Sequence, residues 1–165
     1  MLLLTFTAGG ERYALDVAGV IELVPRVELR AIPHAPAYLA GLLGYRGEVV
    51  PVIDLGLLLG SSPGADRLST RIILVKSTPD RQNRGGNARV LGLIAERVID
   101  LVEVAPEQVA PAPVHLARAP YLGAIARTDR GFVPLIEAAE LRRLLEPLDE
   151  RVEGLLPSPP MIDHE

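Results

Sequence analysis

The chain begins with a short segment in which apolar and other residues alternate. The alternation runs from residue 2 to residue 7, and strand character returns from residue 12 to residue 15. Gly9-Gly10 lies between these segments and can supply a tight turn, so the pattern predicts a β-hairpin. Between residues 17 and 25 the apolar residues follow helical spacing up to a proline, which predicts a short helix or turn covering one side of that hairpin.

A second hairpin is predicted in the middle of the first half. Apolar segments at 39–45 and 48–53 flank Arg46-Gly47, a two-residue turn whose glycine can adopt a positive φ. The next residue, Asp54, can accept the first free amide hydrogens of a short helix. That helix is expected to end at Gly60, in the left-handed C-terminal position that suits glycine.

The rest of the chain continues the series of short apolar runs between turn residues. The predicted elements are strands at 71–75, 89–93 and 98–104, a polar loop at 77–87, a second Arg-Gly hairpin at 130–131 and a helix at 138–146. With 15 Gly and 15 Pro between short runs, the pattern favours antiparallel sheets and a mainly β class. One domain is expected over residues 1–146, split near 61–70, with a flexible tail at 147–165.

The sequence also repeats itself in part. Residues 46–54 (RGEVVPVID) return as residues 130–137 (RGFVPLIE). The segment PAYL at 36–39 returns as APYL at 119–122, and VIEL at 20–23 returns as VIDL at 98–101. Two copies are too few for a solenoid, so we expect two related lobes that pack against each other and leave a groove between them.

Composition narrows the classes of function. The net charge of −4 argues against nucleic acid as a partner, because phosphate binding relies on clustered basic residues in excess. The chain has no cysteine, which removes thiol chemistry and is consistent with a cytoplasmic location. No signal peptide and no apolar run of about 18 residues is visible, so membrane insertion is not expected.

Candidate catalytic residues are few. His34 and His115 lie in proline-rich loops without metal-ligand spacing. Asp54 and Glu137 hold equivalent places in the two copies, and two helix caps explain them better than a catalytic pair. No phosphate-binding glycine motif is present. The sequence therefore predicts a protein without enzyme activity, metal or cofactor.

Four segments together resemble the CheW-like coupling domain of bacterial chemosensory systems. They are GERYALDV at 10–17, PAYLAG at 36–41, RGEVVPVIDL at 46–55 and EQVAPAP at 107–113. The third is the most specific of the four. The resemblance implies two intertwined small five-stranded β-barrels with short helices around a shared core, in agreement with the internal repeat.

The same resemblance implies a function. Members of this family are adaptors that join methyl-accepting chemoreceptors to the regulatory domain of a CheA-type histidine kinase, in signal-transduction arrays at the membrane. They also assemble with that domain into rings. The expected location is therefore cytoplasmic, at receptor arrays.

Matching the family's motif positions gives candidate partner-binding residues. Glu22 falls on the acidic position after the first strand pair, and Arg46 falls on the arginine of the N-L-R-G turn. Here that turn reads Gly44-Tyr45-Arg46-Gly47, so Tyr45 adds a ring and the asparagine is lost. The residues expected near the groove are Val17, Leu23, Val98 and Leu101.

Two questions stay open at the level of sequence. Each aliphatic groove residue could equally be part of a barrel core, since a core and a helix-binding groove use the same residue types. The groove could also serve a different class of function, that of a small-molecule-binding β module.

Overall fold

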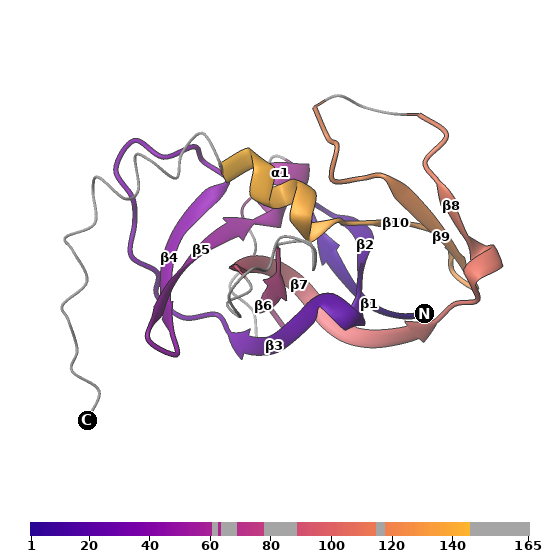
Figure 1. Cartoon of the computed structure of the whole chain (residues 1–165), viewed down its shortest axis with the longest axis horizontal. Coiled ribbons are helices and arrows are strands. Elements are labelled where there is room, and N and C mark those ends of the chain that lie inside the picture. Colours follow the sequence, from indigo (N-terminus) through magenta and orange to yellow (C-terminus); the bar gives the residue numbers. More distant parts are fainter. Residues whose placement is uncertain (61–62, 64–68, 78–88, 115–117, 146–165) are drawn as a thin grey trace.

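The computed structural model describes residues 1–60, 63, 69–77, 89–114 and 118–145 and shows a mainly β protein with short helices, as predicted (Figure 1). The strands are β1 (Leu2–Ala8), β2 (Glu11–Asp16), β3 (Val20–Pro25), β4 (Leu39–Tyr45), β5 (Glu48–Asp54), β6 (Arg71–Lys76), β7 (Val90–Glu103), β8 (Val109–Pro111), β9 (Ala124–Thr128) and β10 (Gly131–Leu135). Among the described residues the helices are two 3-10 turns at Val17–Gly19 and Pro106–Gln108, α1 (Leu55–Leu59) and a helical segment at 138–145. The predicted tail and most of the polar loop at 77–87 lie outside the described residues.

The strands form two sheets that share β7. One sheet, here called the β5 sheet, has the order β4-β5-β7-β6-β3. The other, called the β1 sheet, has the order β7-β1-β2-β10-β9-β8. The ladders of the described residues leave both sheets open, although one bridge between Arg30 and Leu42 partly covers the β4 edge. The lobes are therefore curled sheets joined by one long strand, with five strands in one and six in the other.

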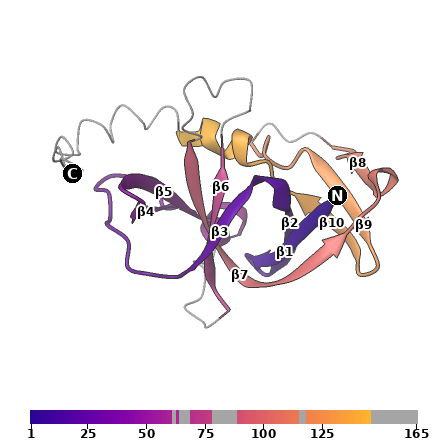
Figure 2. The same cartoon turned by 60° about the horizontal axis from the view of Figure 1, so that its bottom comes forward.

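The two lobes are intertwined because the chain crosses from one sheet to the other after β2 and again within β7. The β1–β2 hairpin belongs to the β1 sheet, whereas β3, which follows it, pairs with β6 in the β5 sheet. The β6–β7 hairpin does the reverse, since the second half of β7 pairs with β1. In Figure 2, β3 and β7 lie in front and run between the two lobes. The sheets thus combine strands from both sides of residues 61–70, and the predicted split along the chain stays a prediction.

Two-sided burial explains how these short strands form a stable core. Alternate residues of β1 face different clusters: Leu4 and Phe6 join the main core between the sheets, and Leu3 joins a smaller core inside the β1 sheet. A third cluster around Val52 fills the β5 sheet. Aliphatic residues suit both faces of such strands because they pack closely without polar atoms. The helical segment at 138–145 covers the main core with Leu141 and Leu145, of which Leu141 is fully buried.

Three local predictions need correction. Only residues 17–19 are helical after the first hairpin, and residues 20–25 form β3, because pairing with β6 satisfies backbone groups that a lone helical turn leaves free. The strands predicted at 89–93 and 98–104 are one strand, β7, with a bulge where it changes sheet. Gly60 ends α1 in an extended conformation and not in the left-handed one.

The sequence repeat is visible in matching hydrogen bonds. The backbone N–H of Asp54 donates to the carbonyl of Tyr38 at 2.8 Å, and the N–H of Glu137 donates to the carbonyl of Tyr121 at 2.9 Å. Each acidic residue directly precedes a helix. The strand before each one also makes a parallel pair, β5 with β7 and β10 with β2. The two halves therefore share one local plan.

Candidate functional site

The β4–β5 hairpin and the neighbouring edge strand β3 bring together three of the predicted partner-binding residues. Arg46 lies in the turn with φ 47°, followed by Gly47 with φ 77°, so both turn residues have the left-handed backbone of a tight hairpin. The Tyr45 hydroxyl donates to Glu22 Oε2, and Arg46 Nη2 lies 3.7 Å from the same oxygen. The guanidinium carbon of Arg46 is 5.1 Å from the centre of the Tyr45 ring.

This cluster is held by electrostatics at the surface. The side chain of Arg46 is 76% exposed and that of Glu22 is 42% exposed, so their ion pair contributes about 0.2–1 kcal/mol at most. The hydrogen bond to Glu22 is the main cause that raises the pKa of Tyr45 above its ordinary value of 10.0, with smaller contributions from desolvation. These three contacts fix the orientation of a charged, aromatic patch at the surface.

The predicted groove residues separate into two groups. Leu23 and Leu101 are exposed, on β3 and on the second half of β7. Val17 is half-buried, at the 3-10 turn between the sheets, and packs against the main core. Val98 is only 6% exposed and belongs to the main core. For Val98 the structure favours the core alternative that the sequence left open.

A second charged pair lies on the β1 sheet. Asp100 on β7 and Arg130 in the β9–β10 turn are 3.8 Å apart, in the same relation as Glu22 and Arg46. The sequence analysis did not select these two residues. The repeat contained the signal, since Asp100 stands in the echo of Glu22 and Arg130 in the echo of Arg46.

Equivalent residues of the two hairpins are separated along the chain by a number of residues that differs by one from the separation of the two Arg-Gly pairs. Leu43 lies opposite Val50 in the first hairpin, and Ala126 lies opposite Val133 in the second. Both steps give the same offset, 126 − 43 = 83 and 133 − 50 = 83. The two Arg-Gly pairs are 130 − 46 = 84 residues apart, one residue out of structural register.

The turns account for this shift. In the second hairpin Thr128 pairs with Gly131, so Asp129 and Arg130 form the turn, and Gly131 has the positive φ of 102°. Thr128 therefore occupies the structural position of Tyr45. Arg130 still reaches its acidic partner because its long side chain spans the difference.

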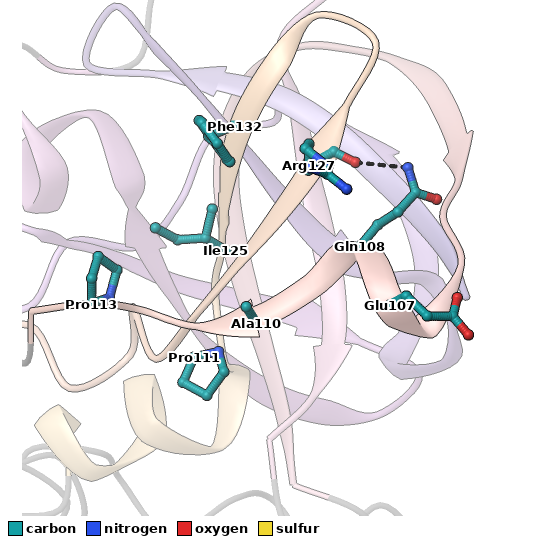
Figure 3. A pocket seen from close by; sticks show the side chains of 8 residues that line it. All are labelled: Glu107, Gln108, Ala110, Pro111, Pro113, Ile125, Arg127 and Phe132. Carbon is teal, nitrogen blue, oxygen red and sulfur yellow. Dashed lines mark hydrogen bonds between the residues drawn. The ribbon is translucent and has the colours of Figure 1, made fainter.

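An apolar cavity of about 430 Å³ opens at the far end of the β1 sheet (Figure 3). It lies over β8, β9 and β10, and Phe132, Ile125, Pro111 and Pro113 supply its apolar lining. At the opposite rim Gln108 donates to the carbonyl of Arg127 at 3.0 Å, which ties the 3-10 turn to β9. Phe132 is 75% exposed. This surface is at the opposite end of the molecule from the β4–β5 hairpin (Figure 1).

The structure describes the remaining candidate residues except His115. His34 is an exposed loop residue with φ 62°, and His115 lies outside the described residues. Asp54 caps α1, as predicted, by accepting from the backbone N–H groups of Gly56 and Leu57. Within the described residues, no three His, Asp or Glu side chains are grouped closely enough to hold a metal ion. No helix in the described part of the chain is long and apolar enough to cross a membrane.

The fold and these surfaces define a class of protein. Two intertwined sheets carry separate exposed patches, with ion-paired hairpins on each lobe and an apolar cavity at one end. This is the form of a protein-interaction scaffold. A family model described as the CheW-like domain matches residues 2–146, and the chain belongs to that family.

Individual relatives agree with the family assignment. A probable chemotaxis protein CheW from Rhizobium etli is 32% identical over 111 residues, which are 67% of this chain and 66% of that protein. A chemotaxis protein CheW from Treponema pallidum is 26% identical over 145 residues, covering 84% of this chain and 80% of that one. The match to the Rhizobium etli protein spans just under two thirds of that relative's length.

A solved structure has the same fold. The scaffolding protein TtCheW from Thermoanaerobacter tengcongensis superposes with a TM-score of 0.68 and 27% sequence identity, covering 82% of this chain and 87% of that one. The two relatives are named as chemotaxis proteins, and the solved structure is named as a scaffolding protein.

Proposed function

We propose that this protein is a non-catalytic adaptor that couples methyl-accepting chemoreceptors to the regulatory domain of a CheA-type histidine kinase. The observation that carries the proposal is the family match over residues 2–146, together with the exposed cluster of Glu22, Tyr45 and Arg46 at one of its motif positions. Its place of action is the cytoplasmic face of receptor arrays.

The spacing of the surfaces supports a role with more than one partner. The charged hairpin on the β5 sheet and the apolar cavity on the β1 sheet lie at opposite ends of the molecule, so two proteins can be bound at once without overlap (Figure 1). Exposed aliphatic residues on the edge strands, Leu23 and Leu101, suit the apolar ridge of a receptor helix. Charged rims then set partner choice and the association rate.

The test of this proposal is calorimetric titration of the full chain with the regulatory domain of each CheA-type kinase from its own genome. We expect saturable binding to at least one of them in the micromolar range, on the order of −8 kcal/mol. Reconstituted receptor, kinase and adaptor then report receptor-dependent kinase control. Absence of binding to every kinase domain contradicts the adaptor role.

Arg46→Glu tests the cluster itself. It removes the pair with Glu22 and places two negative charges side by side, so we expect receptor-dependent control of the kinase to fall at least tenfold while the melting temperature stays within about 4 °C of the wild type. Arg143→Glu is a matched control, because Arg143 is similarly exposed and pairs with Glu140 away from the hairpin. Equal losses in the two variants, or unfolding of the first, contradict a specific role for Arg46.

A further inference from the structure

The first hairpin supplies its own aromatic ring between an acid and a base. Tyr45 donates its hydroxyl proton to Glu22, and the Arg46 guanidinium lies against the ring at 5.1 Å from its centre. A phenol is suited to this place because its oxygen can donate to a carboxylate and its face attracts a cation. The first hairpin thus shows how an acidic and a basic side chain in this fold bind a tyrosine side chain between them.

The second hairpin has the same acid and base without the ring. Thr128 stands at the register position of Tyr45, and its hydroxyl is occupied within the turn, where it donates to the carbonyl of Gly131 at 2.9 Å. Asp100 and Arg130 keep their 3.8 Å pair, with about half and three quarters of their side chains exposed. Beside them opens a cavity of about 180 Å³, lined by Arg12, Asp100, Leu101, Val102, Thr128, Asp129 and Arg130.

We propose that this cavity, called here the tyrosine pocket, binds a tyrosine side chain presented by a protein partner. The phenol hydroxyl donates to the Asp100 carboxylate, the ring face lies against the Arg130 guanidinium, and the exposed Leu101 side chain contacts the ring edge. The volume of about 180 Å³ is similar to that of an apolar cavity of about 150 Å³ that holds benzene, although charged side chains form most of this lining.

Charge in the pocket favours a neutral donor over other occupants. Arg12 and Arg130 balance Asp100 and Asp129, so the lining carries no net charge. A lysine or arginine from a partner meets the two guanidinium groups, and a carboxylate meets the two aspartates. Phenylalanine fills the space but offers no proton to Asp100, whereas a hydrogen bond to a charged acceptor is among the stronger ones in proteins.

This contact goes beyond the adaptor role, which requires neither a tyrosine nor this pocket. The test uses the folded full chain and a small probe, so that its result is independent of kinase binding. Amide resonances in a ¹⁵N spectrum are followed while N-acetyltyrosinamide is added, and the titration is repeated with N-acetylphenylalaninamide. We expect saturable shifts at residues 100–102 and 128–131, with the tyrosine probe binding about tenfold more tightly than the phenylalanine probe.

Two variants exchange the residue types at the equivalent positions 45 and 128. Thr128→Tyr places the chain's own ring in the pocket, and we expect it to abolish the response to the probe, while Thr128→Ser keeps the response. Tyr45→Thr opens the first hairpin, and we expect a second set of shifts around residues 22 and 45–48. Asp100→Ala is expected to remove the preference for tyrosine over phenylalanine without unfolding the chain, because Asp100 is half exposed.

Several results overturn the proposal. Equal affinities of the two probes show that the hydrogen bond to Asp100 is not made. Shifts that persist in Thr128→Tyr, or that lie away from the second hairpin, place the binding elsewhere. Absence of saturable shifts up to the solubility of the probe shows that the pocket does not receive a phenol.

Discussion

Removal of the Asp54 carboxylate tests the physical basis of the repeated strand-to-helix junction. Asp54 is 3% exposed and ends β5. Its Oδ1 accepts from the backbone N–H of Gly56 at 2.9 Å and from that of Leu57 at 3.3 Å. These are two of the N–H groups that a helix leaves without partners at its start. In Asp54→Ala both lose their acceptor, one in a buried and one in a partly buried place.

The expected size of the effect follows from these contacts. A hydrogen bond to a charged group contributes about 1.5–3 kcal/mol, and loss of a helix cap typically costs about 0.5–2 kcal/mol. Both bonds share one oxygen, and the second is long, so they do not count in full. We expect a loss of about 2–3 kcal/mol in the free energy of unfolding. For a domain of this size that corresponds to a fall of about 4–12 °C in the melting temperature.

The assay is urea and thermal unfolding followed by circular dichroism. Asp54→Asn keeps an oxygen acceptor and is expected to lose less than about 1 kcal/mol. Glu137→Ala is the control in the other copy, since Glu137 is exposed at the start of the helical segment at 138–145 and is expected to lose less than about 1 kcal/mol. If Asp54→Ala loses no more than Glu137→Ala does, the buried cap is not what stabilises this junction.

Three further predictions concern packing, backbone strain and pH. A Cβ added at Gly60 would lie 2.8 Å from Gly9 Cα, so Gly60→Ala is expected to lower the free energy of unfolding by about 1–3 kcal/mol. Gly44 has open space around it, so Gly44→Ala is expected to leave the free energy of unfolding unchanged. Equal urea midpoints of the two variants refute the steric explanation. Arg97 has φ 49° in the β7 bulge, a backbone conformation that a β-branched residue adopts only with strain. Arg97→Val is therefore expected to lower the free energy of unfolding by about 1–2 kcal/mol, and Arg97→Gly is expected to leave it unchanged. If the valine variant melts at the same temperature as the wild type, the backbone at residue 97 is not strained. Burial raises the pKa of Tyr121 above 10.0, so its stabilising contribution is complete below pH 10 and disappears as pH rises through the folded pKa. Urea midpoints from pH 9 to 11.5 are expected to fall less in Tyr121→Phe than in the wild type, and identical curves exclude this cause.

The sequence alone was enough to predict the local elements with strong turn signals. Both hairpins of the first half, the cap at Asp54 and the mainly β class followed from alternation, glycine turns and a carboxylate before a leucine run. These features depend on contacts within a few residues, so the local pattern carries them. The family resemblance came from the same source, because its motifs are the turns and strand ends themselves.

Tertiary structure decided which strands pair and where the repeated residues meet. Residues 20–25 have helical spacing but form β3, since an edge of β6 was available to pair with them. Val98 and Leu101 look alike in sequence, yet one is in the core and the other is at an open strand edge. Thr128 takes the place of Tyr45 because the paired strands of the two hairpins keep one offset along the chain, 128 − 45 = 83, although the Arg-Gly pairs are 130 − 46 = 84 residues apart. Burial and partner atoms depend on contacts between distant segments, and the local pattern does not contain them.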